Sequence, residues 1–173
     1  MIPVLTGERV LLRGLDWADF EDFATLWGDP ALKRFLPFAP VARDECWVRM
    51  NRIAWHWAHY GFGNFAVVAR EDGAFLGQIG LFHVMRGIGE DFDAAPEAGW
   101  VLNAAARGRG LASEAAEIVH RWFDSQRFGG RTVCMMDVDH AGSIRVAEKC
   151  GYRLLRLDED EWGPLQLMER VRG

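Results

Sequence analysis

Hydrophobic residues recur at helical spacing in several separate stretches of the chain. Phe20, Phe23 and Trp27 follow Asp16, whose carboxylate suits a helix N-terminus, and precede Gly28, which suits a helix end. Three later stretches share this periodicity. The helices expected there run from about Asp44 to Tyr60, from Leu111 to Gly129, and from a capping Ser143 to about Cys150.

Short apolar segments between turn-forming residues predict β-strands. Asp72-Gly73 is a strong turn signal that joins two of these segments into a hairpin. Leu36–Pro40 and Arg86–Pro96 are expected to be loops, and Asp158–Glu161 an acidic turn. The expected strands are Val10–Arg13, Phe65–Arg70, Phe75–Val84, Glu97–Leu102, Arg131–Val138, Tyr152–Leu157 and Leu165–Val171.

The element order is one strand, two helices, several antiparallel strands, and then alternating strands and helices. This order predicts an α/β or α+β fold. The chain has 173 residues, 50% of them hydrophobic, and neither repeats nor a linker interrupt it. We therefore expect a single domain spanning residues 1–173.

Composition narrows the classes of function. The net charge is −5 without a basic run, which disfavours a general nucleic-acid binder. The chain has no 18-residue apolar run and no signal-like N-terminus, so neither a membrane span nor secretion is expected. Three scattered cysteines without a CxxC motif, and histidines without ligand spacing, predict no metal site and fit the reducing cytoplasm.

The strongest chemical signal is the turn Arg107–Ala112, which leads into Ser113 and a helix. Glycines let backbone N–H groups approach a ligand, and a helix N-terminus attracts anions such as a pyrophosphate. A P-loop needs a lysine that this turn lacks. A dinucleotide fingerprint needs glycine or alanine where Ser113 stands, and it comes early in its domain. From the turn alone, a plain structural role stays open.

An ordered set of segments resembles one known superfamily. Arg107–Ala112 (RGRGLA) resembles the Q/R-x-x-G-x-G/A signature of the GNAT superfamily of N-acetyltransferases. Phe75–Leu81 (FLGQIGL), Glu97–Leu102 (EAGWVL) and Ser143–Tyr152 (SIRVAEKCGY) are similar to segments of its Rim-type branch, which includes ribosomal-protein N-terminal acetyltransferases. The resemblance implies a mixed, mostly antiparallel central sheet flanked by helices, with one splayed pair of strands.

The resemblance also implies acetyl-coenzyme A as co-substrate, with no metal. Its pyrophosphate would lie on Arg107, Gly108, Arg109, Gly110, Leu111, Ala112 and Ser113, and its pantetheine arm along Trp100, Val101 and Leu102. Ser143 matches the position assigned to the thiol, and Glu97 is the candidate general base. His140 stands where the family usually has asparagine, so it is either a proton carrier or a surface or hydrogen-bonding residue.

The expected function is acetyl transfer to a primary amine by direct attack on the thioester. An α-amine with a pKa of about 8 is roughly a tenth neutral at pH 7, whereas a lysine amine is less than about 0.1% neutral. The acceptor is a protein N-terminus or a small-molecule amine, and it would contact Phe35–Val41 and Val84–Pro96. The alternative is a non-catalytic module that binds acyl-coenzyme A. No nucleic-acid or membrane partner is expected, and both a monomer and a homodimer stay open.

Overall fold

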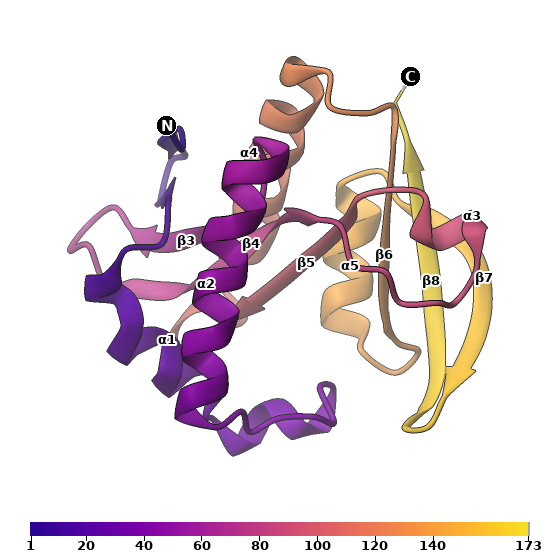
Figure 1. Ribbon diagram of the computed structural model, residues 1–173, viewed down its shortest axis with the longest axis horizontal. Helices are drawn as coiled ribbons and strands as arrows, with labels where there is room; N and C mark the ends of the chain where they lie inside the picture. Colours follow the sequence, from indigo (N-terminus) through magenta and orange to yellow (C-terminus); the bar gives the residue numbers. More distant parts are fainter. Residues whose placement is uncertain (173) are drawn as a thin grey trace.

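One eight-stranded sheet, in the order β1-β2-β3-β4-β5-β6-β8-β7, forms the centre of the computed structural model, which describes residues 1–172 (Figure 1). Neighbouring strands are antiparallel except β5 and β6, which are parallel. The mixed, mostly antiparallel fold predicted from the sequence is confirmed. The strands are β1 (Leu5–Thr6), β2 (Val10–Arg13), β3 (Asn64–Ala69), β4 (Phe75–Phe82), β5 (Glu97–Leu102), β6 (Arg131–Asp137), β7 (Arg153–Asp160) and β8 (Gly163–Val171).

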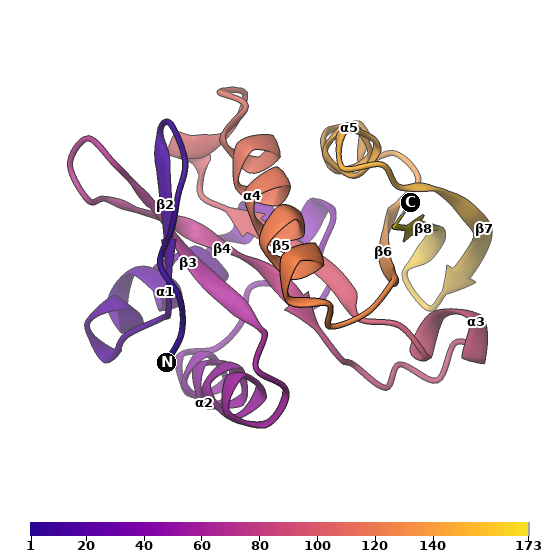
Figure 2. The ribbon, with the colours of Figure 1, turned by 90° about the horizontal axis from the view of Figure 1, so that it is seen from above.

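Helices cover both faces of the sheet, with α1 and α2 on one side and α4 and α5 on the other (Figure 2). Because side chains alternate along a strand, each face has its own core. Phe65 and Ile79 pack with residues of α4, whereas Val101 packs against the cluster formed by α1 and α2. The helices are η1 (Trp17–Asp19), α1 (Phe20–Trp27), η2 (Pro30–Arg34), α2 (Arg43–Tyr60), α3 (Glu90–Asp93), η3 (Ala104–Ala106), α4 (Leu111–Gln126) and α5 (Ala141–Lys149).

Two expectations about local structure are wrong. The segment Asp158–Glu161 is not an acidic turn, because β7 continues through Asp160, which lies opposite Gly163. Charged residues are common on an edge strand, where they discourage pairing with another chain. Ser143 does not cap α5, which begins at Ala141 after His140.

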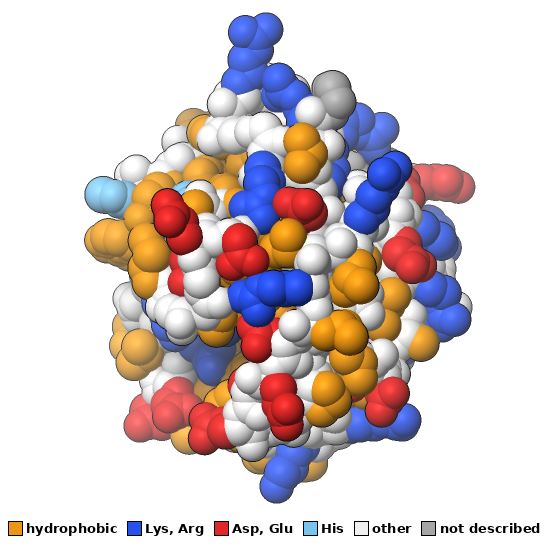
Figure 3. Space-filling view, turned by 90° about the vertical axis from the view of Figure 1, so that its right-hand side faces the viewer, with side chains coloured by type: hydrophobic (Ala, Val, Ile, Leu, Met, Phe, Trp, Pro, Cys, Tyr) orange, Lys and Arg blue, Asp and Glu red, His pale blue; other side chains and the backbone are white. Residues whose placement is uncertain are grey.

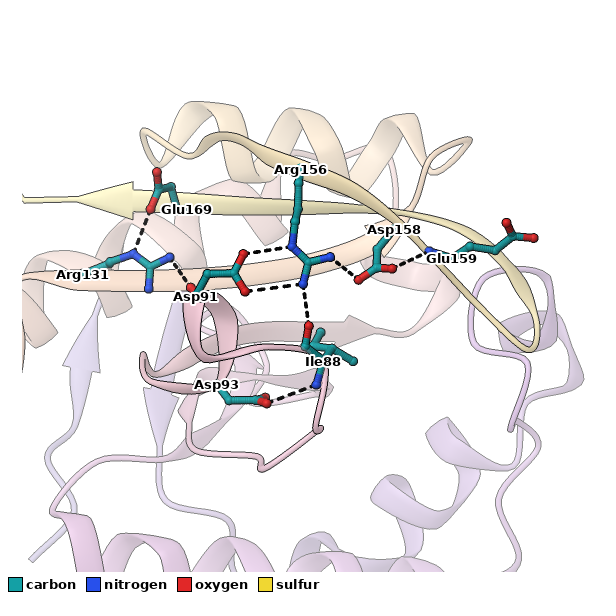
Figure 4. A network of polar contacts seen from close by, with 8 residues as sticks. All are labelled: Ile88, Asp91, Asp93, Arg131, Arg156, Asp158, Glu159 and Glu169. Carbon is teal, nitrogen blue, oxygen red and sulfur yellow. Dashed lines mark hydrogen bonds and ion pairs between the residues drawn. The ribbon is translucent and has the colours of Figure 1, made fainter.

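Part of the expected loop Arg86–Pro96 forms α3, and this segment is bound to the last hairpin (Figure 4). Arg156 of β7 donates to the Asp91 carboxylate at 2.9 Å and to the Ile88 carbonyl at 2.6 Å, and also contacts Asp158. Arg131 of β6 bonds Glu169 at 2.8 Å and reaches the carbonyl of Asp91. These bonds fix a segment that its composition would leave mobile.

The face formed by the last hairpin carries mixed side chains. Leu154, Leu157 and Trp162 are exposed there. Acidic and basic side chains are interspersed with the hydrophobic ones on this side of the molecule (Figure 3). Such mixing keeps an edge strand from presenting a continuous apolar surface. Separately, no helix within residues 1–172 has the length and apolar character needed to cross a membrane.

Replacing Arg156 with alanine should release the segment from 86 to 95. We expect amide hydrogen exchange at Ile88–Asp93 to become faster in Arg156→Ala, while exchange in α4 stays unchanged. Arg153→Ala, at an exposed position of the same strand, is the matched control. Equal exchange rates in both variants would show that the Arg156 contacts do not hold this segment.

Candidate functional site

The glycine-rich turn adopts a conformation that its glycines require. Gly108 and Gly110 have φ values of 71° and 75°, a left-handed region that other residues enter at a cost. A side chain at Gly108 would meet no atom within 4 Å, so the turn faces open space. The short helix η3, capped by the Asn103 side chain, lies between β5 and this turn.

The turn and the first residues of α4 present a row of free backbone donors. Among residues 1–172, no acceptor pairs with the N–H groups from Gly108 to Ser113, and Gly110 provides no side-chain cap. Leu111 buries its side chain and contributes only its backbone. The helix dipole adds partial positive charge at the same place. Free donors at a helix N-terminus form a site for an anion.

The charged side chains around the turn are arranged to keep it positive. Arg107 and Arg109 are exposed, and Arg109 also donates to the carbonyl of Ala105. Glu114 points back to β2, where its carboxylate accepts hydrogen bonds from the Arg9 backbone at 2.7 Å and the Arg9 guanidinium at 2.8 Å. Arg9 also donates to the Arg109 carbonyl at 2.8 Å. Arg9 therefore both offsets Glu114 and holds the turn, a role that sequence reasoning missed.

Replacing Glu114 with glutamine should destabilise the fold in a pH-dependent way. Burial raises the pKa of Glu114, but the hydrogen bonds from Arg9 and Val10 outweigh burial and leave the pKa lowered. A lowered folded-state pKa stabilises the protein above the unfolded-state pKa, and this contribution is lost as pH falls through the folded value. We expect Glu114→Gln to lose about 1 kcal/mol of unfolding free energy at pH 7 and less at pH ~3, below the ordinary glutamate pKa of about 4.3. Denaturant unfolding at both pH values measures this. Glu117→Gln is the control, and an equal loss at both pH values would contradict the assignment.

The open edge of β5 lies beside the turn. β5 and β6 share one ladder pair, Glu97 with Val133, and then diverge. The N–H of Val133 bonds the Pro96 carbonyl, and the N–H of Asn103 bonds Leu76 of β4. Because backbone groups alternate between the two edges of a strand, those of Trp100 and Leu102 face the splay. Those of Val101 pair with β4 instead, so only part of the expected pantetheine-binding segment is open.

His140 and Ser143 meet Trp100 at the α5 end of the splay. The His140 side chain caps α5, and its Nδ1 accepts the N–H of Ser143 at 3.3 Å. Trp100 Nε1 donates to Ser143 Oγ at 3.2 Å, and His140 Nε2 lies 3.2 Å from the same oxygen. Phe35 stacks on the imidazole with ring centres 3.9 Å apart. The structure therefore brings two of the three expected catalytic residues together.

Glu97 lies elsewhere, at the closed end of the splay and on the face covered by α1 and α2. It is buried, and both carboxylate oxygens accept hydrogen bonds from Arg86, at 2.6 and 2.7 Å. Its charge is therefore already balanced. Two acids of the segment before β5 are engaged too: Asp93 accepts the backbone N–H groups of Arg86 and Gly87, and Asp91 pairs with Arg156. This geometry favours an ion-pair role for Glu97 over that of a general base.

Two polar residues on the same face were not singled out from the sequence. Gln78 lies opposite Val101, and Asn64 lies opposite Gly80, so both side chains share the face that carries Glu97. The buried oxygens Gln78 Oε1 and Asn64 Oδ1 have no hydrogen-bond partner within the described chain. A polar residue inside an otherwise apolar strand is the signal that could have identified them. No group of three or more metal-binding side chains occurs among residues 1–172.

Comparison with known proteins identifies the family. A model described as an acetyltransferase (GNAT) domain matches residues 9–153. The uncharacterized N-acetyltransferase YnaD of Bacillus subtilis (strain 168) is 23% identical over 149 residues, which cover 86% of this chain and 82% of that protein. A structure described as a GNAT-family acetyltransferase of Bordetella pertussis is 27% identical, with a TM-score of 0.87 over 98% of this chain and 99% of that one.

More distant structures share the fold. A ribosomal-protein-S5-alanine acetyltransferase of Vibrio fischeri is 17% identical, with a TM-score of 0.80 over 98% and 97% of the two chains. A spermidine N-acetyltransferase of Vibrio cholerae, in complex with CoA and spermine, is 14% identical, with a TM-score of 0.75 over 95% and 96%. Because the family model spans most of the sequence, this chain belongs to the GNAT acetyltransferase family.

Proposed function

We propose that the chain transfers an acetyl group from acetyl-coenzyme A to a primary amine. One observation carries the proposal: a turn of free N–H donors leads, along the open edge of β5, to the hydroxyl of Ser143. The first feature fits a pyrophosphate, the second an extended amide chain, and the third a leaving thiolate. Membership of an acetyltransferase family supports the same assignment.

The residues present fit coenzyme A. The N–H groups from Gly108 to Ser113, with Arg107 and Arg109, would bind the pyrophosphate. The backbone groups of Trp100 and Leu102 would pair with the amides of the pantetheine arm, as an added strand pairs with a sheet edge. Coenzyme A supplies a thioester, whose carbonyl carbon an amine can attack.

Two groups of this chain then serve the chemistry. The amine nitrogen attacks while neutral, and negative charge develops on the carbonyl oxygen. A backbone N–H on the open edge of β5 would stabilise that charge, with Trp100 as the candidate donor. The departing sulfur takes up a proton, and Ser143 is the candidate donor.

The state of Glu97 bears on the choice of acceptor. Both carboxylate oxygens of Glu97 are bound by Arg86, so this carboxylate is not free to accept a proton from a lysine-like amine. An α-amine, with a pKa of about 8, needs less help from a base. This favours a peptide N-terminus, in line with a Rim-type enzyme and with the S5-alanine acetyltransferase among the fold neighbours. A small amine, as in the spermidine enzyme, is the second acceptor class.

Gln78 and Asn64 would bind the acceptor. Their unpaired carbonyl oxygens lie on the face of the sheet that carries Glu97. A buried unpaired oxygen is costly, and an amine N–H would satisfy it. The amine would therefore approach from the α1–α2 face, and the coenzyme from the α4–α5 face.

A non-catalytic module that binds acyl-coenzyme A is the second candidate. The histidine at position 140 and the paired state of Glu97 favour it. The two candidates separate in one assay: purified protein is mixed with acetyl-coenzyme A and a panel of peptides and small amines, and free thiol is measured. Coenzyme binding without thiol release on any acceptor would favour the module.

Acetyl transfer of this kind needs no nucleic acid and no membrane surface, and a monomer or a homodimer would serve equally. The three cysteines form no disulfide among residues 1–172, which is consistent with a reducing compartment. We therefore propose the cytoplasm as its location.

Replacing Gly110 with tryptophan should abolish coenzyme binding. The new side chain would meet the Arg9 guanidinium that holds the turn, and it would strain a left-handed residue beside the free N–H groups. We expect affinity for coenzyme A in titration calorimetry to fall at least about a hundredfold. Gly73→Trp, with the same φ of 75° and open surroundings, is the matched control. Unchanged affinity in Gly110→Trp would place the coenzyme elsewhere.

Replacing Gln78 with leucine should weaken acceptor binding alone. Loss of one hydrogen bond predicts a KM for the amine roughly tenfold higher, with affinity for coenzyme A unchanged. Gln166→Leu on β8 is the control. An unchanged amine KM would remove Gln78 from the acceptor site.

A further inference from the structure

The hydroxyl oxygen of Ser143 is approached by two ring nitrogens from different elements. Trp100 Nε1, on β5, donates to Ser143 Oγ at 3.2 Å, and an indole nitrogen can only donate. His140 Nε2, at the start of α5, lies 3.2 Å from the same oxygen. The direction of this second bond depends on where the imidazole carries its proton.

The helix cap settles the tautomer. The backbone N–H of Ser143 can only donate, so His140 Nδ1, its acceptor at 3.3 Å, must carry a lone pair. Burial is the largest cause and lowers the pKa of His140, and Arg34 and Arg107 lower it further. A hydrogen bond with its own backbone and the charge of Asp137 raise the pKa, but the net shift is downward, so the neutral ring prevails at pH 7. The single proton of the neutral ring therefore sits on Nε2. His140 donates to Ser143 Oγ, as Trp100 does.

Both lone pairs of Ser143 Oγ are thus occupied, and its own hydrogen is the one that remains to be placed. No hydrogen bond donated by this hydroxyl occurs within residues 1–172. We propose that Trp100 and His140 are positioning residues. By occupying both lone pairs of the Ser143 hydroxyl, they leave it able only to donate its hydrogen, and it donates to the sulfur of coenzyme A. This inference rests on the proposed acetyl transfer.

The protons and electrons of the proposed transfer balance. The amine nitrogen forms a bond to the carbonyl carbon, the C–S bond breaks, and sulfur keeps the electron pair. Ser143 gives its proton to sulfur, and the acylated nitrogen loses one proton to water. Solvent then returns a proton to Ser143. While its oxygen is negative, the N–H groups of Trp100 and His140 stabilise it, as charge-assisted hydrogen bonds do.

The imidazole ring is held from the other half of the molecule. Phe35, which ends η2, stacks on His140 with ring centres 3.9 Å apart and planes 25° from parallel. Arg34 lies over the Phe35 ring at 5.0 Å. The segment after α1 and the helix α5 therefore fix the donor nitrogen together. An asparagine could cap the helix in the same way but is too short to carry this stack.

Trp100→Phe tests the proposal, because it removes the N–H and keeps an aromatic ring. We expect kcat to fall roughly tenfold, with KM for acetyl-coenzyme A within about twofold of the parent. Trp122→Phe, in the same hydrophobic core, is the matched control and should leave kcat unchanged. Melting temperatures confirm that all variants fold.

A double-mutant cycle separates positioning from simple packing. If Trp100 acts through the hydroxyl, Trp100→Phe should lower kcat in the parent but not in a Ser143→Ala background. An equal fall in both backgrounds, or no fall in the parent, would overturn the proposal.

A second measurement does not depend on turnover. The thiol of bound coenzyme A is titrated by the ultraviolet absorbance of its thiolate. A hydroxyl that donates to sulfur favours the thiolate, so Ser143→Ala and Trp100→Phe should both raise the thiol pKa. An unchanged thiol pKa would overturn the proposal. If the parent binds coenzyme A but releases no thiol from acetyl-coenzyme A, the proposed transfer fails while this titration still decides the network. If it does not bind coenzyme A, both fail.

Discussion

The divergence of β5 and β6 is the constraint on which the candidate site depends. The two strands are neighbours in the sheet but share one ladder pair, Glu97 with Val133. Each is held along its length by another partner, β5 by β4 and β6 by β8, so neither can bend toward the other. A row of backbone donors and acceptors is left open in the middle of the sheet. Unpaired backbone groups are costly, and an extended ligand with amide groups is the natural partner for them.

The same divergence organises the charges and donors around it. The turn at Gly108 and Gly110 lies where β5 leaves the sheet, and α4 directs its N-terminus there. One carboxylate near that terminus, Glu114, would repel an anion if it pointed outward. Arg9 removes this obstacle by binding Glu114 against β2 and donating to the Arg109 carbonyl. A chain with a net charge of −5 thereby keeps a locally positive corner.

Local patterns predicted what depends on local physics. The glycines of the turn adopt positive φ values that other residues rarely adopt, so the turn and the helix start after it could be predicted from the sequence. The bounds of β5 also match the prediction. Contacts across the fold were not predictable in the same way. Serine and histidine can both cap a helix, and the Phe35 stack, which no local pattern shows, sets the His140 ring. Glu97 looked free because its partner Arg86 lies on a preceding segment whose path the sequence does not show.

The buried histidines show how neighbouring backbone groups decide what an imidazole can do. At His56, Nδ1 faces the Phe62 carbonyl and Nε2 accepts the N–H of His83. At His120, Nδ1 faces the Ala116 carbonyl, and burial lowers the pKa to about 4. In both rings a carbonyl requires the proton on Nδ1. At His140, Nδ1 accepts the backbone N–H of Ser143 instead. The single proton of the neutral ring therefore lies on Nε2, which faces Ser143 Oγ.

The assignment of a lone pair to Nδ1 and a proton to Nε2 argues against His140 as a proton carrier. A carrier must take up a second proton, and the nitrogen that would receive it is Nδ1, which already accepts the N–H of Ser143. Protonation would therefore break the cap of α5 and displace Ser143 along with it. A neutral, fixed imidazole that accepts at Nδ1 and donates at Nε2 is compatible with the helix, whereas one that takes up a second proton is not. The contacts of His140 thus serve to fix how the serine hydroxyl is held.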